Sequence, residues 1–87
     1  MDDLGDRIEA CTLALLEAAR AADAIVSGDL RVSEANAAML LGLSAGTMRN
    51  WRQQGEGPRA FSTPMDGCRV SYRLVDLATW VELGLER

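Results

Sequence analysis

Histidine and lysine are absent from this 87-residue chain, which also has only two cysteines and two prolines. The lack of histidine excludes Ser–His and Cys–His nucleophilic pairs and removes the commonest metal ligand of proteins. Cys11 and Cys68 match no metal-binding spacing, and two lone thiols favour a reducing cytoplasm over a disulfide-bonded exterior. Paired carboxylates and a phosphate-binding glycine loop are missing too. We therefore expect no catalytic residues, no metal and no cofactor, and a protein that is not an enzyme.

A basic leader and a long apolar run are missing as well. Met1 is followed by two aspartates, which is not the pattern of a secretory signal. The most apolar stretch, LALLEAARAADAIV, contains Glu17, Arg20 and Asp23, so we expect it not to span a bilayer. These features predict a cytoplasmic protein without membrane contact.

Charge is distributed unevenly along the chain. The formal net charge is −4, and all nine basic residues are arginine. Residues 1–30 hold seven acids against two arginines, whereas residues 45–73 hold five arginines against two acids. The acidic total therefore hides a basic segment, and the net charge is a poor guide to the partner of that segment. A chain of this length allows one compact domain with a marginal core.

The first segment is predicted to be a long helix from about Asp3 to Val26, ended by Ser27-Gly28. Aspartates crowd its start, where the helix dipole favours anions. Its apolar residues recur at alternating steps of four and three, as in a coiled-coil seam. These candidate dimerisation residues are Leu4, Ile8, Cys11, Leu15, Ala18, Ala22 and Ile25. Two interpretations remain open: the helix packs on its own domain, or it pairs two chains through residues 3–26. On this basis we divide the chain into the helix, residues 1–28, and a second unit, residues 29–87.

Residues 31–58 predict two short helices joined by a tight turn. Ser33 precedes EANAAMLLG as an N-cap, with Ala35, Ala38, Met39 and Leu41 expected on the inward face. Gly42 ends this helix, and Ser44 caps a second helix over residues 45–54 that stops at Gly55. This order is typical of a helix-turn-helix.

The second of these helices gathers hydrogen-bond donors on one face. Met48 and Trp51 are spaced to point inward, which places Arg49, Asn50 and Gln53 together on the opposite face. Arginine can read guanine, and asparagine and glutamine can read adenine, in the major groove of DNA. An ordinary solvated helix face is the alternative interpretation of the same pattern.

The remaining residues predict a hairpin and a closing helix. Strands are expected at residues 61–63 and 69–72, joined by a turn over Pro64 to Gly67 in which Asp66-Gly67 is the strongest hairpin signal. Val70 and Tyr72 should face one way, and Arg69, Ser71 and Arg73 the other. The stretch LVDLATWVELGL predicts a short helix with Leu74, Leu77, Ala78 and Val81 facing inward. The expected fold class is therefore mostly α with a small β-hairpin.

The stretches VSEANAAMLLGLSAGTMRNWRQQGEGPRAF and GCRVSYRLVDLATWVE resemble the small winged helix-turn-helix domains of the excisionase and MerR-like superfamily, including AlpA-type regulators of phages and mobile elements. The matching features are a Ser-Glu-Ala helix start, a Leu-Gly-Leu-Ser turn, a Thr-Met-x-x-Trp helix, an arginine-bearing hairpin and a closing Asp-Leu-x-x-Trp helix. The resemblance covers about residues 31–83 and leaves the first 28 outside. It implies a winged helix-turn-helix preceded by a long N-terminal α-helix.

What the resemblance implies is binding to double-stranded DNA in a bacterial or phage-infected cell. Helix 45–54 would enter the major groove and hairpin 60–72 would act as the wing. Matched by residue, the base-contact candidates are Arg49, Asn50 and Gln53, and the phosphate-contact candidates are Ser44, Thr47, Arg52, Arg69 and Arg73. With four or five phosphates neutralised, the logarithm of affinity should fall against the logarithm of salt with a slope of roughly −4. Such domains act in transcription regulation or DNA recombination, as a homodimer or cooperative multimer with a recombinase, polymerase or terminase partner.

Two departures from the family pattern bear on sequence-specific DNA reading, and two alternative functions remain open. Ala45 and Gly46 stand where relatives often carry polar side chains, and the turn around Met65 is less basic than many wings. One alternative is a DNA-recognition subunit of the phage terminase small-subunit type. The other is a protein-interaction module that keeps a winged-helix fold but no longer binds DNA.

Overall fold

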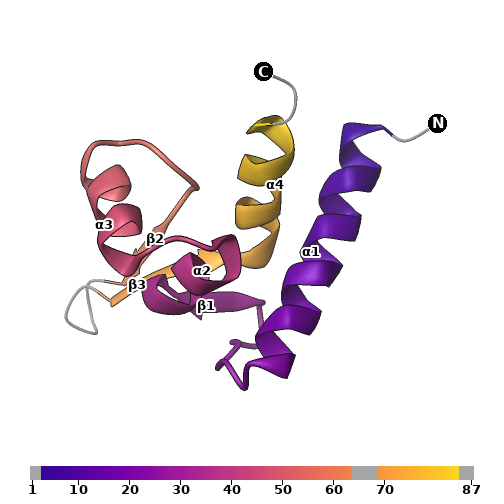
Figure 1. The fold of residues 1–87 in the computed structure, drawn as a ribbon, viewed down its shortest axis with the longest axis horizontal. Coiled ribbons are helices and arrows are strands. Elements are labelled where there is room, and N and C mark those ends of the chain that lie inside the picture. Colours follow the sequence, from indigo (N-terminus) through magenta and orange to yellow (C-terminus); the bar gives the residue numbers. More distant parts are fainter. Residues whose placement is uncertain (1–2, 64–68, 85–87) are drawn as a thin grey trace.

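The computed structural model describes residues 3–63 and 69–84, which form four helices and one antiparallel sheet of three strands. The fold is thus mostly helical with a small sheet, as the sequence predicts at that level. The helices are α1 (Leu4–Ala21), α2 (Glu34–Leu41), α3 (Ala45–Gln53) and α4 (Leu74–Gly84), and the strands are β1 (Arg31–Ser33), β2 (Phe61–Thr63) and β3 (Arg69–Arg73). Figure 1 shows α1 and α3 at opposite ends of the molecule, with α2, α4 and the sheet between them.

The predicted hairpin is confirmed, but the sheet has a third strand that the sequence did not reveal. β3 is central and pairs with both neighbours, so that the strand order is β1-β3-β2. Phe61 lies opposite Ser71 in the hairpin, and Val32 lies opposite Tyr72 on the other side. β1 has only three residues, and its partner lies about forty residues further along the chain, so no local pattern marks it. The predicted turn between β2 and β3 lies outside the described residues.

α1 ends five residues earlier than predicted. The backbone N–H of Ala24 donates to the carbonyl of Ala19 at 2.9 Å, and Asp23 adopts a left-handed φ of 55°. This is a Schellman motif, in which aspartate takes the place that glycine usually holds. The heptad spacing continues past the break, but the residues there are not helical, and Ile25 is 85% exposed.

α2 and α3 begin at the predicted caps and stop at the predicted glycines. The Ser33 and Ser44 hydroxyl oxygens accept the N–H groups of Asn36 and Thr47, both at 3.1 Å. Gly42 and Gly55 have φ values of 73° and 75°, which an L side chain rarely adopts. The predicted inward face of α2 is wrong in part, because Ala35 and Met39 are exposed. The buried residues are Ala37 and Ala38, with Leu41 half-buried.

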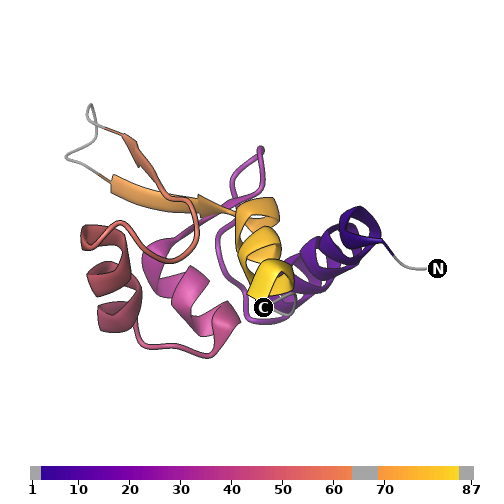
Figure 2. The ribbon, with the colours of Figure 1, turned by 90° about the horizontal axis from the view of Figure 1, so that it is seen from above.

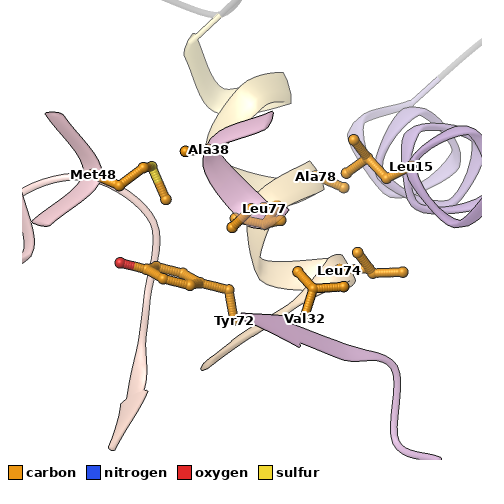
Figure 3. Close-up of a cluster of buried hydrophobic side chains, with 9 residues drawn as sticks. Leu15, Val32, Ala38, Met48, Tyr72, Leu74, Leu77 and Ala78 are labelled. Atoms are coloured by element: carbon orange, nitrogen blue, oxygen red, sulfur yellow. The ribbon is translucent and has the colours of Figure 1, made fainter. Parts of the chain in front are cut away.

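The core is formed where α2, α4 and the sheet meet. Figure 3 shows Met48 and Tyr72 reaching it from one side and Leu15 of α1 from the other, with Leu77 of α4 between them. The predicted inward residues Leu74, Leu77 and Ala78 are fully buried, and Val81 is half-buried. α1 packs mainly against α4, as both Figures 1 and 2 show. The helix therefore enlarges the small core of its own chain, which is one of the two interpretations that its sequence allowed.

Candidate nucleic-acid interface

α3 is held so that one face enters the core and the other is open to solvent. Met48 is 1% exposed. Trp51 is half-buried and lies against Trp80 of α4, with ring centroids 5.2 Å apart and planes tilted by 44°. A side chain at Gly57 would bring its Cβ to 3.1 Å from Trp51, so glycine lets the following loop close over this indole. These contacts fix the rotation of α3 about its own axis.

The three base-contact candidates lie together on the open face of α3. Arg49, Asn50 and Gln53 are all exposed. Their spacing of one, three and four residues places them on one side of the helix. α1 does not cover them, because it packs at the far end of the molecule (Figure 1). The structure therefore brings these side chains together on an accessible surface.

Ser44 and Thr47 are joined at the start of α3. Besides its capping bond, the Ser44 hydroxyl lies 2.8 Å from the Thr47 hydroxyl, and either can be the donor. Only one of the two protons is used in this contact, so the pair keeps one hydroxyl donor for another group. Both phosphate candidates thus sit beside the free N–H groups of the first turn, where an anion is favoured.

Arg52 is the phosphate candidate whose charge is already compensated. Its Nε donates to Oε2 of Glu34 at 2.8 Å, and its Nη2 donates to Oε1 at 3.3 Å. The Tyr72 hydroxyl donates to the same Oε2 at 2.7 Å. The three side chains come from α3, α2 and β3, so this network ties all three elements together. A sequence-based count treats Arg52 as a free cation because the pairing with Glu34 spans 18 residues.

The network shifts the proton affinities of its members. Hydrogen bonds from Arg52, with a further contribution from Tyr72, lower the pKa of Glu34 despite its partial burial, and the Arg49 charge adds to this effect. Burial, followed by the hydrogen bond to Glu34, raises the pKa of Tyr72 well above its ordinary range. Glu34 is therefore held ionised and Tyr72 neutral at pH 7.

The β2–β3 hairpin carries the last two phosphate candidates on its outer face. Arg69 is exposed and makes no ion pair with a described residue. Arg73 lies over the ring of Phe61, with its Cζ 4.9 Å from the centroid, and its Nη2 is 4.0 Å from Oδ2 of Asp29. No described carboxylate therefore compensates the charge of Arg69, whereas the charge of Arg73 is partly shared with Asp29.

Three further charged residues lie near these arginines and were not among the predicted site residues. They are Asp29, Arg31 and Arg59. Arg31 of β1 donates from Nε to both carboxylate oxygens of Asp29, at 2.9 and 2.8 Å. Arg59 lies over the same Phe61 ring at 5.8 Å. Hydrogen bonds from Ser27 and then Arg31 lower the pKa of Asp29 to about 2. Because β1 has only three residues and no local pattern marks it as a strand, the sequence carries no signal that places Arg31 on this face.

The predicted dimerisation residues are divided between the core and the surface. Ile8 and Cys11 pack against the core cluster, and Leu15 belongs to it. Leu4 is half-buried, whereas Ala18, Ala22 and Ile25 are exposed. Burial, then the nearby Glu82 carboxylate, raises the pKa of the Cys11 thiol. Pairing of two chains through this helix stays a prediction, since the buried part of the seam already has a partner within the chain.

The part of the chain that the structure describes has neither the features of a metal site nor those of a membrane span. Within it, His, Cys, Asp and Glu side chains form no group of three that could hold a metal ion. None of the helices described is long and apolar enough to cross a bilayer. No protein-family model, curated protein or solved structure matches this chain.

Proposed function

We propose that this protein binds double-stranded DNA as a winged helix-turn-helix, with α2 and α3 as the helix-turn-helix and the β2–β3 hairpin as the wing. The observation that carries the proposal is the accessible cluster of Arg49, Asn50 and Gln53 on α3. Their guanidinium and carboxamide groups can make the paired hydrogen bonds that distinguish guanine and adenine in the major groove. The opposite face of α3 is anchored by Met48 and Trp51, so the helix is presented as a rigid unit.

The phosphate contacts follow from the charges left uncompensated. Arg69 supplies a cation on the hairpin that no residue of the described ranges compensates, and Arg73 supplies part of one. The Ser44–Thr47 hydroxyl pair adds a neutral donor at the start of α3. Arg52 is left out of these contacts because Glu34 already compensates its charge. Its role is to hold α3 against α2 and β3.

Binding to a pool of random duplexes at two salt concentrations tests this proposal. Fluorescence anisotropy with a labelled pool should show binding at low salt that weakens as salt is raised, because phosphate contacts release counterions. Selection from the pool should then enrich a preferred sequence, because α3 carries base-reading groups. No binding at low salt, with the chain shown to be folded, would rule the proposal out.

The biological output that fits best is that of a transcriptional regulator or a recombination directionality factor, acting beside a polymerase or a recombinase. A DNA-recognition subunit of a terminase uses the same contacts. The genes beside this one separate these outputs, since an integrase gene indicates excision and a large terminase gene indicates packaging.

Because the contact area is small, we expect one copy of the protein to bind DNA weakly. A second copy on the same duplex would raise the occupancy of the DNA site. We propose a homodimer or a cooperative multimer for this reason. Sedimentation of the full chain at high micromolar concentration, with and without duplex, measures the stoichiometry. A monomer without duplex, together with one copy per duplex when DNA is present, would contradict this proposal.

A protein-interaction module is the second candidate. Ala45 and Gly46 leave the start of α3 without base-reading groups. Trp51 and Trp80, with Gly55, Glu56 and Gly57, line an open pocket of about 530 Å³ that offers a partner protein a recess on this surface. This candidate predicts no salt-dependent binding to any duplex.

A further inference from the structure

β3 is longer than its neighbour β1, and the space beside its first residues forms an open pocket. β1 ends at Ser33, opposite Ser71, where the chain turns into α2. Val70 and Arg69 therefore have no β1 neighbour. The pocket has a volume of about 460 Å³. The apolar side chains of Ile25, Val32 and Val70 make up much of its lining. Its polar lining comes from both strands, from α2 and from the loop before β1, and consists of Ser27, Arg31, Ser33, Asn36, Arg69 and Ser71.

Three of the four neutral polar groups of this pocket are donors with protons to spare, whereas the Ser27 hydroxyl already donates to Asp29 at 2.6 Å. The Ser33 hydroxyl oxygen accepts the N–H of Asn36, and the Ser71 hydroxyl oxygen accepts Nη1 of Arg31, both at 3.1 Å. A hydroxyl whose oxygen is occupied as an acceptor still has its own proton to donate. The side-chain amide of Asn36 has no hydrogen-bond partner among the described residues. Three donors are thus available for a group that only accepts.

One of the two charged groups of the pocket, Arg69, favours an anion. The other, Arg31, is fixed in place by two hydrogen bonds to Asp29 and one to Ser71, and Asp29 compensates its charge. Arg69 brings a positive charge that no described carboxylate compensates. Hydrogen bonds from a guanidinium to an oxyanion are about twice as strong as neutral ones. Ser33 and Asn36 also lie at the start of α2, where the helix dipole adds to the attraction.

We propose that this pocket binds one phosphodiester group of the DNA backbone, as a contact separate from those of α3. This inference rests on the proposed function and extends it to residues of α2 and β1. Inorganic phosphate has the same oxyanion chemistry. The backbone is the source we assign, because Arg69 belongs both to the pocket and to the hairpin that would follow the duplex.

Asn36→Asp tests the inference because its effects on folding and on binding have opposite signs. An acidic side chain at the third position of α2 favours the helix dipole and the capping arrangement, so the variant should unfold no more easily than the wild type. In the pocket, however, a carboxylate replaces a donor and repels a phosphate. We expect about tenfold weaker binding to a random duplex pool. Asn36→Ala, which adds no charge, should bind about threefold more weakly than the wild type.

Ala14→Glu is the matched control. It adds the same charge at an exposed position of α1, which lies away from the sheet (Figure 2), and should leave duplex binding nearly unchanged. Equal losses for Asn36→Asp and Ala14→Glu, or no loss for Asn36→Asp, would overturn the inference while leaving the proposed function intact.

Amide NMR of the wild type with inorganic phosphate separates the two possible sources. If the wild type binds no duplex, the proposed function fails. Shifts at Ser33, Asn36 and Ser71 would then assign the pocket to free phosphate, and the absence of shifts would show that it takes no anion. Either result overturns the backbone assignment.

Discussion

Arg52 and Glu34 form a two-point ion pair that joins α3 to α2, with distances of 2.8 and 3.3 Å between their nitrogen and oxygen atoms. The Tyr72 hydroxyl donates to one of the same oxygens from β3. The pair is partly shielded, since the side chains of Arg52 and Glu34 are 30% and 17% exposed. Because α3 presents the proposed reading residues on its far side, the geometry of this pair sets where those residues lie.

Replacing Glu34 by glutamine should destabilise the fold by about 1–2 kcal/mol at pH 7, since it leaves Arg52 without its counter-charge in a partly shielded place. The Glu34 pKa is lowered in the folded state, so its ionised form stabilises the fold above the unfolded value of 4.5. That contribution is lost as the pH falls through the folded value. Urea unfolding of both proteins between pH 7 and pH 3 should show a difference that shrinks with acid. A constant difference would mean that the charge of Glu34 does not stabilise the fold.

Tyr72 offers a spectroscopic test of the same network, because it is the only tyrosine of the chain. Its raised pKa means that the folded protein should show no phenolate absorbance around pH 10, where an exposed tyrosine titrates. The neutral hydroxyl stabilises the fold below that pH, and this contribution is lost as the pH rises further. In urea the same residue should titrate near 10. A native titration near 10 would contradict the buried hydrogen bond to Glu34.

The parts of the fold that could be predicted from the sequence are those with a local signal. The limits of α2 and α3 were predicted because Ser33, Ser44, Gly42 and Gly55 act on the adjacent turn alone. The end of α1 was missed because Asp23 adopts a conformation usually taken by glycine. The inward face of α2 was predicted wrongly in part because apolar residues of α2 occur on all sides of the helix. Their spacing therefore does not indicate which side faces the core.

Pairings between distant residues could not be predicted from the sequence. β1 was missed because it becomes a strand only by pairing with β3. The exposed face of α3 was predicted, since Met48 and Trp51 mark its opposite side. The compensation of Arg52 by Glu34, and of Arg31 by Asp29, depends on how the elements meet and so required the structure.

Alanine substitutions at Arg49 and Arg69 should separate base reading from backbone contact. Arg49→Ala should weaken binding to the selected sequence by about 1–3 kcal/mol and affect random DNA less, because a bidentate base contact is lost. Arg69→Ala should weaken binding to both alike, because phosphates carry no sequence information. Anisotropy titrations of each variant against the two duplexes measure this. Equal effects of both substitutions on both duplexes would contradict the assigned roles.

The salt dependence of binding should be shallower than the slope of roughly −4 expected from the sequence. The compensation of Arg52 by Glu34, and in part of Arg73 by Asp29, lowers the four or five expected phosphate contacts to about three. At about 0.9 per phosphate, the slope of log affinity against log salt should be about −3. Glu34→Gln frees the Arg52 charge and should steepen the slope toward −4. An unchanged slope would show that Arg52 does not face the phosphates even when it is unpaired.

Two leucines of α1 test whether this helix belongs to the core of its own chain. Leu15 is 9% exposed and lies in the core, whereas Leu13, two residues away, is 57% exposed. Leu15→Ala should therefore lower the free energy of unfolding by about 2–3 kcal/mol, and Leu13→Ala by less than about 0.5 kcal/mol. Urea denaturation at two protein concentrations measures both effects and also detects association, because the midpoint of a dimer depends on concentration. If the two substitutions cost the same, α1 does not pack against α4 in solution. The surface of α1 then becomes available for pairing two chains.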